Sequence, residues 1–495
     1  MSLTQLLPFE LAQEFGIVPM ADEGSAITVA TAPHMTVATL SAARQRLGKP
    51  LRTQSVTADR FREIVTQTYA THSVKQGSSV TEKSTRTDAT TDATTGADLL
   101  SSIANDSDSP AVRIVSELLR EALARGASDI HLDATEQGGR VRFRVDGILK
   151  DARDTDSATH AALVARCKVM AILDIAERRL PQDGRLQVAI AGHRVDVRVA
   201  TLPTQHGERV VLRLLDTSAA RLDLAALGFQ ATTLEALRSA ARMPHGLVLV
   251  TGPTGSGKTT TLYAAVTELD RERLNVVSVE DPVEYALDRV AQTQVNPRIE
   301  LTFARALRSI LRHDPDVIIV GEIRDRETAE IAIQASLTGH LVLASLHTNT
   351  AGAAITRLAD MGVEPYLLAS SLRGVLAQRL VRKLCVECRK KRDVTVEELA
   401  LLERHHAVPD VGIKSLFEAV GCTACSGTGY RGRVGLYRWM PLTADIARAV
   451  HSHVADIELE ALAGKAGWPA IASDAARHLA DGTTSLSEVL RVVTA

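Results

Sequence analysis

Apolar and polar positions follow different patterns in different parts of this chain, and each pattern predicts a different kind of structure. From about residue 225 onward, short apolar runs bounded by Gly, Asp or Pro recur between stretches of helical character, and they read LVLVTGP, NVVSVED, DVIIVGE and HLVLASLH. Runs of this kind are typical of parallel strands that are buried on both faces. The region therefore predicts an α/β domain, whose ligands bind at the carboxyl ends of the strands.

The residues before this region have a different periodicity. AVRIVSELLREALARGASDIHLDA, which begins at residue 111, predicts an amphipathic helix, a stop at Gly126 and a strand. Apolar and charged residues then alternate in RVRFRVDGILKDA and HRVDVRVATLPTQHGERVVLRLL, as in half-buried antiparallel strands. We expect an α+β domain over 111–222 and a flexible joint near 221–227 that lets it move against the α/β domain.

Composition marks the remaining boundaries. Residues 74–110 are mostly Ser, Thr, Asp, Gly and Ala, which bury too little apolar surface to offset the entropy cost of ordering. We expect a flexible linker there, and a small first module over 1–73 with ITVAT as a strand. Further along, we expect the α/β domain to cover 223–380, followed by a cysteine-containing subdomain at 381–435 and a helical C-terminal region at 436–495.

Overall composition excludes several classes of protein. The 495 residues are 45% hydrophobic and 23% charged, which is ordinary globular usage for about three or four domains. A formal net charge of −2 gives no support for binding nucleic acid by bulk electrostatics, although it leaves room for a local basic patch over 379–392. We find neither a secretory signal nor the roughly 18 uninterrupted apolar residues of a membrane span. We therefore expect a cytoplasmic protein that reaches a membrane only through partners.

The strongest chemical motif lies in LVLVTGPTGSGKTTTLY, where a strand-like run precedes G-x-x-x-x-G-K-T and a helix-forming stretch follows it. In such a loop the backbone N–H groups converge on phosphates, Lys258 reaches the β/γ oxygens and Thr259 offers its hydroxyl to Mg²⁺. A Gly-rich turn that binds nothing is the alternative, but the flanking strand and helix favour an ATP site. Its candidate residues are Gly252, Pro253, Thr254, Gly255, Ser256, Gly257, Lys258, Thr259 and Thr260.

Acidic residues follow two of the other strands. Glu280, Asp281 and Glu284 in VEDPVEY come after the second strand, where a carboxylate can orient or deprotonate the attacking water. Glu322 follows the next strand, at the place where P-loop enzymes usually keep the acidic residue that holds Mg²⁺ directly or through water. Because Gly321 stands where the usual Asp would be, we expect Glu322 to take over that role, to share it with the base, or both.

Histidines and arginines complete the candidate site. His340 precedes the last strand of the group and His347 follows it, where a histidine can sense the γ-phosphate or contact a neighbouring subunit. Each such residue alone is more often structural, but together, beside successive strands, they favour a site. Phosphoryl transfer also needs positive charge, often from outside the nucleotide's own domain. Within the core the strongest candidate is Arg324. The α+β domain offers four arginines, for which a solvated face is the alternative: Arg194, Arg198, Arg209 and Arg213.

Four of the five cysteines form two C-x-x-C pairs, Cys385 with Cys388 and Cys422 with Cys425. Two thiolate pairs give tetrahedral S₄ coordination, which suits Zn²⁺ and leaves no open position, so the predicted role is structural. A redox dithiol is the competing interpretation, although one pair would suffice for it. The fifth cysteine, Cys167, lies on an apolar-periodic helix, and we expect it to be an inert core residue.

These motifs resemble those of the secretion ATPase superfamily, most closely the type II secretion system assembly ATPase. The resemblance covers nearly the whole chain and includes LPFELAQEFGIVP, GASDIHLD, LPQDGRL and RVATLPTQHGERVVLRLLD. It implies a RecA-like P-loop ATPase core preceded by an α+β, PAS-like domain and a small N-terminal domain, with a zinc-binding insertion and a helical C-terminal part. It also implies a hexameric ring at the cytoplasmic face of the inner membrane that drives pseudopilus assembly and protein export across the outer membrane.

The resemblance also implies roles for single positions. Glu284 is expected to activate water and Glu322 to serve Mg²⁺, with the two roles open to exchange. The four arginines match the family's phosphate contacts, and the paired cysteines match its zinc ligands. The first module matches a domain that docks on an inner-membrane platform protein. A polytopic inner-membrane platform protein is the second partner that the resemblance implies. The Walker A motif of the family corresponds to residues 252–259, its aspartate box to 280–284, its Walker B motif to 317–322 and its histidine box to 339–347.

Three other functions compete with this interpretation. The type IV pilus assembly ATPase shares every core motif, but the short first module and LPFELAQEFGIVP favour secretion. A nucleotide-gated scaffold would assemble without hydrolysis and would not need Glu284 and Glu322. A nucleic-acid motor is disfavoured because the net charge is near zero and stacking aromatic residues are scarce.

Overall fold

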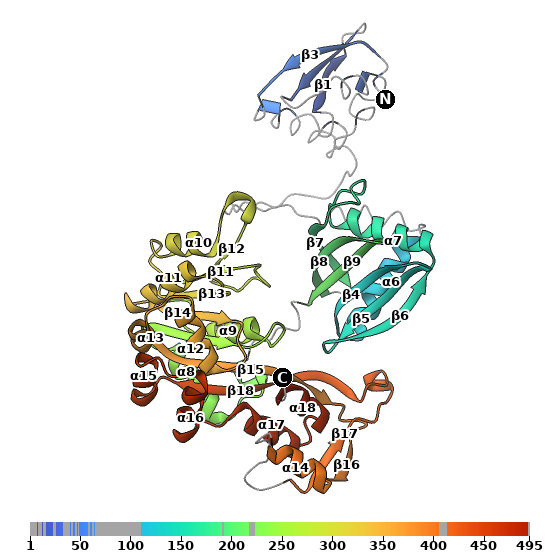
Figure 1. The fold of residues 1–495 in the computed structure, drawn as a ribbon. Helices are drawn as coiled ribbons and strands as arrows, with labels where there is room; N and C mark the ends of the chain where they lie inside the picture. The colour runs from blue at the N-terminus through green and yellow to red at the C-terminus, as the bar shows by residue number, and fades with distance from the viewer. Residues whose placement is uncertain are drawn as a thin grey trace, which may run out of the picture. The chain divides into compact units, whose positions relative to one another are not determined.

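The computed structural model describes residues 110–190, 193–216, 223–404 and 413–493, and short segments between residues 7 and 64 (Figure 1). The chain divides into two compact units, Met1–Ala93 and Thr94–Ala495, and each is described by itself. The predicted linker at 74–110 lies outside the described residues, except that Pro110 begins a helix.

The described strands of the first unit form one three-stranded sheet, in the order β1 (Ile17–Asp22), β2 (Ile27–Thr31) and β3 (Leu51–Ser55). β2 is the predicted ITVAT strand, which is confirmed, and it pairs antiparallel with β1 and parallel with β3. Ile27 and Val29 of β2 are buried in a core with Leu7 and Phe61. The described part of this unit therefore has a hydrophobic core of its own.

The second unit begins with an α+β module built on a six-stranded antiparallel sheet, in the order β6-β5-β4-β9-β8-β7. The predicted helix, the stop at Gly126, whose φ is +65°, and the strand after it are confirmed. The elements are α6 (Pro110–Ala124), β4 (Ala127–Thr135), β5 (Gly138–Val145), β6 (Ile148–Thr155), α7 (Ser157–Met170), β7 (Gln182–Ile190), β8 (His193–Thr204) and β9 (Gly207–Asp216).

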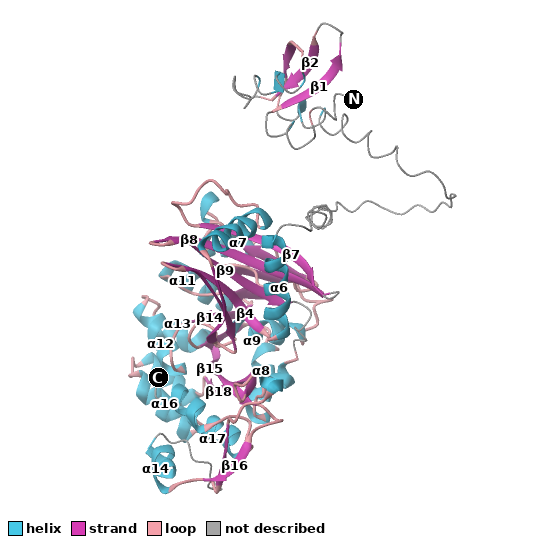
Figure 2. Ribbon diagram, turned by 90° about the vertical axis from the view of Figure 1, so that its right-hand side faces the viewer, coloured by secondary structure: helices cyan, strands magenta, loops and turns pink. Residues whose placement is uncertain are grey.

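Alternation along these strands separates an apolar face from a charged one, because successive strand residues point to opposite faces. Val197 and Leu212 lie on the apolar face, which packs with Leu118 of α6 and Cys167 of α7 in one core (Figure 2). Burial raises the pKa of the Cys167 thiol to about 12, so the expectation of a buried, unreactive cysteine is confirmed. The opposite face carries Arg198, Arg209 and Arg213 of the predicted site.

The α/β region contains a seven-stranded sheet whose first six strands are parallel and whose last strand is antiparallel. The four predicted strands are confirmed as β10, β11, β13 and β14. Sequence patterning did not single out β12, β15 and β18. In sheet order the strands are β12 (Val290–Gln294), β11 (Val276–Glu280), β13 (Val317–Val320), β14 (Leu341–Leu346), β10 (Gly246–Thr251), β15 (Leu372–Leu384) and β18 (Tyr430–Pro441).

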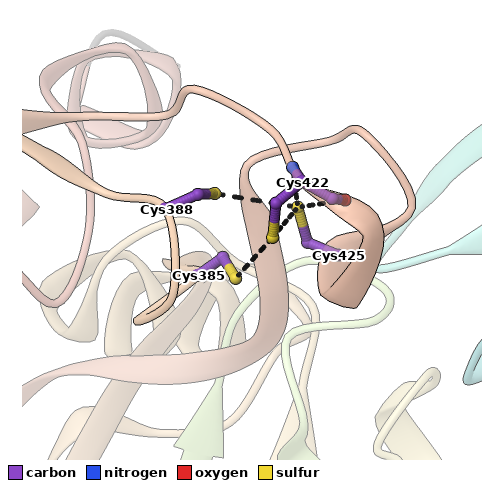
Figure 3. A group of neighbouring side chains, drawn as sticks. All are labelled: Cys385, Cys388, Cys422 and Cys425. Atoms are coloured by element: carbon purple, nitrogen blue, oxygen red, sulfur yellow. Dashed lines mark hydrogen bonds between the residues drawn. The ribbon is translucent and has the colours of Figure 1, made fainter.

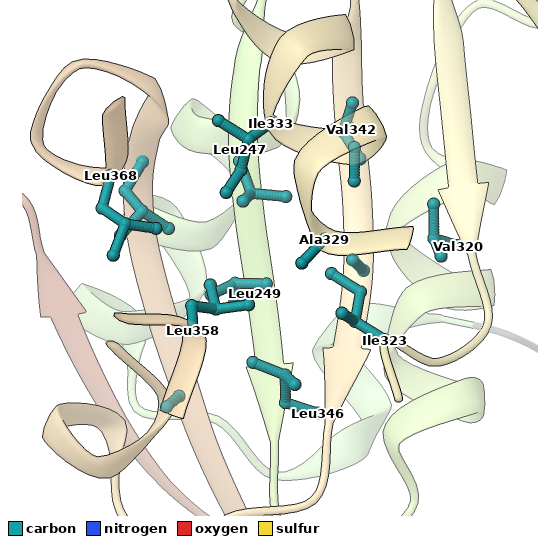
Figure 4. Close-up of a cluster of buried hydrophobic side chains, with 14 of the residues drawn as sticks. Leu247, Leu249, Val320, Ile323, Ala329, Ile333, Val342, Leu346, Leu358 and Leu368 are labelled. Atoms are coloured by element: carbon teal, nitrogen blue, oxygen red, sulfur yellow. The ribbon is translucent and has the colours of Figure 1, made fainter. Parts of the chain in front are cut away.

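Helices cover both faces of this sheet, as the apolar runs predict. Leu247 and Leu249 of β10 face a core shared with α10 to α13, and Figure 4 shows part of it, with Leu358 of α12 and Leu368 of α13. Val248 and Val250 face a core shared with α8 and α9. The helices are α8 (Ala231–Ala241), α9 (Lys258–Thr267), α10 (Phe303–Ile310), α11 (Arg326–Leu337), α12 (Ala351–Asp360) and α13 (Pro365–Ser371), with a short η2 (Pro297–Ile299).

The segment that leads into this sheet differs from the expectation of a flexible joint. Leu224–Leu227 forms a short 3₁₀ helix, η1, capped by the Asp223 side chain, which accepts from the Ala225 N–H at 2.9 Å. Leu224 is 1% exposed and belongs to the core that contains α8 and α9. The expected joint is therefore wrong for 224–227, because burial of Leu224 ties the segment to the core, and 217–222 lie outside the described residues.

The cysteine-containing segment connects the long strands β15 and β18. It packs through Leu402 and Leu416 against α17 and α18, in a core with Ala475 and Val489. The predicted boundaries after residues 380 and 435 fall inside β15 and β18. The elements are β16 (Lys390–Asp393), α14 (Val396–Arg404), β17 (Ser415–Glu418), η3 (Thr423–Cys425), α15 (Ala444–His451), α16 (Asp456–Lys465), α17 (Ile471–Ala480) and α18 (Leu486–Val493).

Candidate nucleotide site and cysteine cluster

The G-x-x-x-x-G-K-T segment forms a tight loop between β10 and α9. Gly252 has a φ of +152°, and a Cβ atom there would lie 2.4 Å from the Gln378 carbonyl oxygen, so only glycine fits. Gly257 has a φ of +90° at the N-cap of α9, where the first backbone N–H groups of the helix have no intrahelical acceptor. This geometry is that of a helix N-terminus prepared for an anion.

Lys258 lies inside this loop and is 8% exposed. Its Nζ donates to the carbonyl oxygens of Gly252 at 2.9 Å and Pro253 at 3.2 Å, and lies 3.4 Å from Nδ1 of His347. Burial lowers the pKa of Lys258 to about 8, with Glu322 opposing that shift and Arg379 adding to it. The Ser256 Oγ is also buried and has no hydrogen-bond partner among the described residues. A triphosphate would give both groups acceptors, so the residues fit the ligand.

Polar side chains from three neighbouring strands meet beside the loop. Glu322, which follows β13, accepts from Arg324 Nε at 2.8 Å and lies 3.1 Å from Nε2 of His347, which follows β14. Arg324 also donates to Asp281, after β11, at 3.2 Å. Burial and the charge of Lys258 lower the pKa of His347, although Glu322 opposes this. Asp281, Glu322 and His347 therefore lie together at the carboxyl edge of the sheet, as the sequence predicts.

Glu280 and Glu284, which the sequence places in one cluster, lie in different environments. Glu280 is 3% exposed, and its carboxylate accepts from the side chains of Tyr263 and Ser278. The Glu284 side chain is 33% exposed and accepts from Nη2 of Arg198 at 3.1 Å. Only Glu284 of this pair is therefore accessible to water and to a ligand.

The arginines of the α+β module do not form one group. Arg198 donates to the Val283 carbonyl at 2.7 Å as well as to Glu284, so it joins the two parts of the second unit. Arg209 and Arg213 form ion pairs inside their own module, with Asp133 and Asp129 respectively, both at 2.9 Å. The side chain of Arg194 lies outside the described residues.

His340 is separated from the other site residues. It stands before β14, and its Nδ1 lies 2.9 Å from the Ala335 carbonyl. Leu341 pairs with Gly246 and Leu346 with Thr251, so β14 runs its full length, roughly 16 Å, between His340 and the phosphate loop. We therefore withdraw His340 from the ATP site, because it lies at the amino edge of the sheet.

The sequence analysis did not identify Gln378 and Arg379, two residues of β15 that lie near the phosphate loop. Gln378 of β15 donates to the Ser256 carbonyl at 2.7 Å and accepts from Thr261 Oγ1 at 2.9 Å. Arg379, the next residue, donates to the backbone and side-chain oxygens of Asn349 at 3.1 and 3.0 Å. The available signal was a polar Gln-Arg pair within the apolar LRGVLAQRLVRKL run.

The four paired cysteines come together in the connecting segment (Figure 3). The sulfur atoms of Cys385 and Cys422 are 3.9 Å apart, those of Cys388 and Cys425 are 3.8 Å apart, and those of Cys422 and Cys425 are 3.7 Å apart. A regular tetrahedron with Zn–S bonds of about 2.3 Å requires S···S separations of about 3.8 Å. The cluster therefore fits a tetrahedral metal ion.

Backbone donors surround the same sulfur atoms. The N–H groups of Cys422 and Gly429 donate to Cys425 Sγ at 3.2 and 3.1 Å, and that of Gly421 donates to Cys388 Sγ at 3.3 Å. Although burial opposes it, these bonds lower the pKa of Cys425 to about 6. Burial instead raises the pKa of Cys388 to about 11. N–H donors of this kind stabilise thiolates, the form that binds a metal.

Known protein families match this chain in both units. The family model "Type II/IV secretion system protein" matches residues 104–491, and a model of an N-terminal domain of GSPII protein E matches residues 6–69. The type II secretion system ATPase E of Vibrio cholerae is 50% identical, with 80% of this chain and 77% of that protein covered. The type II secretion system protein E of Aeromonas hydrophila is 44% identical, with 98% and 96% covered.

Solved structures match the fold. The ATPase DotB of Legionella pneumophila has a TM-score of 0.56 at 20% identity, with 77% of this chain and 95% of DotB covered. The pilus retraction motor PilT has a TM-score of 0.52 at 24% identity, with 76% and 96% covered. The predicted fold class, a RecA-like α/β ATPase core preceded by smaller domains, is confirmed.

Two further findings complete the picture. Among the described helices, none is both long enough and apolar enough to cross a bilayer. The curated relatives carry the name of type II secretion, which favours that system over the pilus alternative. The chain therefore belongs to the type II/IV secretion system protein family, as an ATPase of the type II secretion branch.

Proposed function

We propose that this chain is the motor that uses Mg-ATP hydrolysis to assemble the pseudopilus and so drives protein export across the outer membrane. The observation that carries the proposal is the convergence of Lys258, Glu322 and His347 beside the phosphate loop, with the accessible carboxylate of Glu284 in the segment that follows the neighbouring strand β11. A site that binds ATP only as a structural ligand has no need of an accessible carboxylate beside the γ-phosphate. The relatives named for type II secretion support protein export as the process that ATP hydrolysis drives.

The proposed roles at the site follow from the environment of each group. Lys258 would compensate the charge of the β- and γ-phosphates, and Thr259, the second residue of α9, would place its hydroxyl on Mg²⁺. Glu322 would serve the Mg²⁺ side and Glu284, the more exposed carboxylate, would activate water; exchange of these two roles is the alternative. Removal of a general base typically lowers kcat by about 10²-fold or more.

The arginines of the α+β module are proposed to supply charge from outside the core. Arg198 already bridges to the 283–284 segment, and this contact supports closure of the module onto the nucleotide. Arg209 and Arg213 would exchange Asp133 and Asp129 for phosphate oxygens, of this subunit or of a neighbour. Arg194 is proposed as a further contact on the strength of the resemblance alone.

The remaining proposals concern metal, assembly and place. The cysteine cluster would hold one structural Zn²⁺, which closes the segment between β15 and β18. The chain would work as a homohexamer at the cytoplasmic face of the inner membrane, with residues 1–73 docked on one platform protein and the ring acting on a polytopic one. The match of residues 6–69 to the N-terminal domain model supports the docking role. Residues 74–110 would link that domain to the α+β domain at 111–222 and the core at 223–380.

The first test separates hydrolysis from binding. Full-length wild type, Glu284→Gln and Glu322→Gln are compared for ATP affinity with a fluorescent analogue and for Mg-dependent phosphate release. We expect Glu284→Gln to retain ATP affinity within about threefold and to lose turnover by about 10²-fold. Wild-type turnover in Glu284→Gln would remove Glu284 from the mechanism, and binding without turnover in the wild type would favour the scaffold alternative.

A further inference from the structure

Behind the loop that carries Glu284 lies a buried carboxylate to which three side chains donate. Glu280, at the end of β11, accepts from the Tyr263 hydroxyl on one oxygen. On the other oxygen it accepts from Ser278 Oγ at 2.5 Å and from Gln292 Nε2 at 3.1 Å. A buried charge is tolerated only when its hydrogen bonds are made, and a fully satisfied network of this kind holds its members rigidly.

The network joins three elements that meet at the nucleotide site. Tyr263 stands on α9, five residues after Lys258, so it belongs to the helix whose first turn forms the phosphate site. Glu280 immediately precedes the 281–287 loop, and Gln292 belongs to β12. Gln292 Nε2 also donates to the Tyr263 hydroxyl at 3.1 Å. The phosphate-binding helix is thus bonded directly to the strand from which the loop departs.

The same network holds the far end of the loop. The Tyr285 carbonyl lies 3.2 Å from Gln292 Nε2, so the two hydrogens of this amide are shared among three acceptors, and its Oε1 accepts from the Leu287 N–H at 2.7 Å. The Tyr285 ring stands edge-on to the Tyr263 ring, with 4.8 Å between centroids. Glu284 therefore lies between two points, Glu280 and Tyr285, that are both fixed to α9.

We propose that Tyr263, Glu280 and Gln292 are positioning residues that set Glu284 at the correct distance from the phosphates. The inference rests on the proposed role of Glu284 as the water-activating carboxylate. Displacement of a catalytic group by about 1 Å is sufficient to cost on the order of 10²-fold in rate. Tyr263 and Glu280 are 1% and 3% exposed, and none of the three residues is a proposed contact of ATP, so their effect is expected in kcat and not in ATP affinity.

Removal of one hydroxyl tests the proposal with little disturbance of packing. Tyr263→Phe takes one donor from Glu280 and leaves the ring in place, and we expect kcat for ATP hydrolysis to fall about tenfold while the Kd for ATP changes less than about twofold. The matched control is Tyr285→Phe. The Tyr285 hydroxyl is equally buried but has no hydrogen-bond partner among the described residues, so its removal should leave kcat unchanged. Melting temperatures of both variants report whether the fold is retained.

Combination with Glu284→Gln separates this inference from the proposed function. If Tyr263 acts through Glu284, Tyr263→Phe has no further effect on the residual turnover of the Glu284→Gln protein. A second tenfold loss in that background would overturn the inference while leaving the role of Glu284 intact, as would equal losses in Tyr263→Phe and Tyr285→Phe. Wild-type turnover in Glu284→Gln alone would instead overturn the proposed role of Glu284.

Discussion

Replacement of Glu488 by Gln should weaken the attachment of α18 to the core sheet. Glu488 is 2% exposed, and it accepts from Arg382 Nη2 at 2.8 Å, from the Arg382 backbone N–H at 2.9 Å and from Arg491 Nη2 at 2.9 Å. Although burial opposes ionisation, these donors lower the pKa of Glu488 from 4.5 to about 2. Gln resembles the protonated form of the Glu488 side chain. The difference of about 2.5 between the ordinary and the folded pKa therefore predicts that Glu488→Gln lowers the free energy of unfolding by about 3 kcal/mol at pH 7.

The sign of the pH dependence follows from the lowered pKa. Because the folded value lies below the unfolded one, the stabilisation is complete above about pH 5 and is lost as the pH falls through 4.5 toward 2. The difference between wild type and Glu488→Gln should therefore shrink from about 3 kcal/mol at pH 7 to about 2 kcal/mol at pH 3.5.

The stability difference between wild type and Glu488→Gln can be measured by hydrogen exchange with mass spectrometry, at pH 7 and pH 3.5, on peptides that cover α18. At pH 7 we expect exchange on the order of 10²-fold faster in Glu488→Gln than in wild type. Asp445→Asn is the control, since Asp445 forms an exposed ion pair with Arg448 on α15 and its loss should change stability by no more than about 0.5 kcal/mol. Equal protection in wild type and Glu488→Gln, or a difference that does not depend on pH, would refute the reasoning.

Three other expectations concern the metal cluster and the phosphate loop. Cys425→Ser should lower bound zinc from one ion per chain toward none, measured with a chromogenic chelator, and unchanged zinc would contradict the S₄ site. Gly252→Ala should abolish ATP binding in a fluorescence titration, because its Cβ would meet the Gln378 carbonyl at 2.4 Å; wild-type affinity would show that the loop relaxes. Arg379→Gln loses charge-assisted bonds to Asn349 and should lower kcat/KM for ATP by about tenfold, and an unchanged value would limit Arg379 to packing.

Residue type and spacing carried the local chemistry of the site. The glycines of the phosphate loop, the cysteine pairs and the carboxylates after successive strands are all short-range signals, and the structure brings Glu322, His347 and Lys258 together as expected. These predictions worked because parallel strands align their carboxyl ends at one edge of the sheet. His340 failed because a histidine before a strand and one after it look alike in sequence, although the strand separates them.

Other features depend on contacts between distant segments. The strands β12 and β15 carry polar residues such as Gln292 and Arg379, whose partners lie elsewhere in the chain, so their patterns did not resemble buried strands. The pairing of Arg213 with Asp129 follows from the cross-strand register of β9 and β4, which periodicity does not specify. Burial of Leu224 against the core likewise depends on a tertiary contact and not on local composition.

Steady-state Mg-ATP hydrolysis by the full-length protein tests the central claim most directly. Wild type and Glu284→Gln are measured alone and together with the cytoplasmic domain of the inner-membrane platform protein and vesicles of anionic lipid. A membrane-coupled motor predicts turnover that rises with the platform domain and lipid and is lost in Glu284→Gln under every condition. Turnover that is indifferent to the platform domain and lipid, or that persists in Glu284→Gln, would contradict the account.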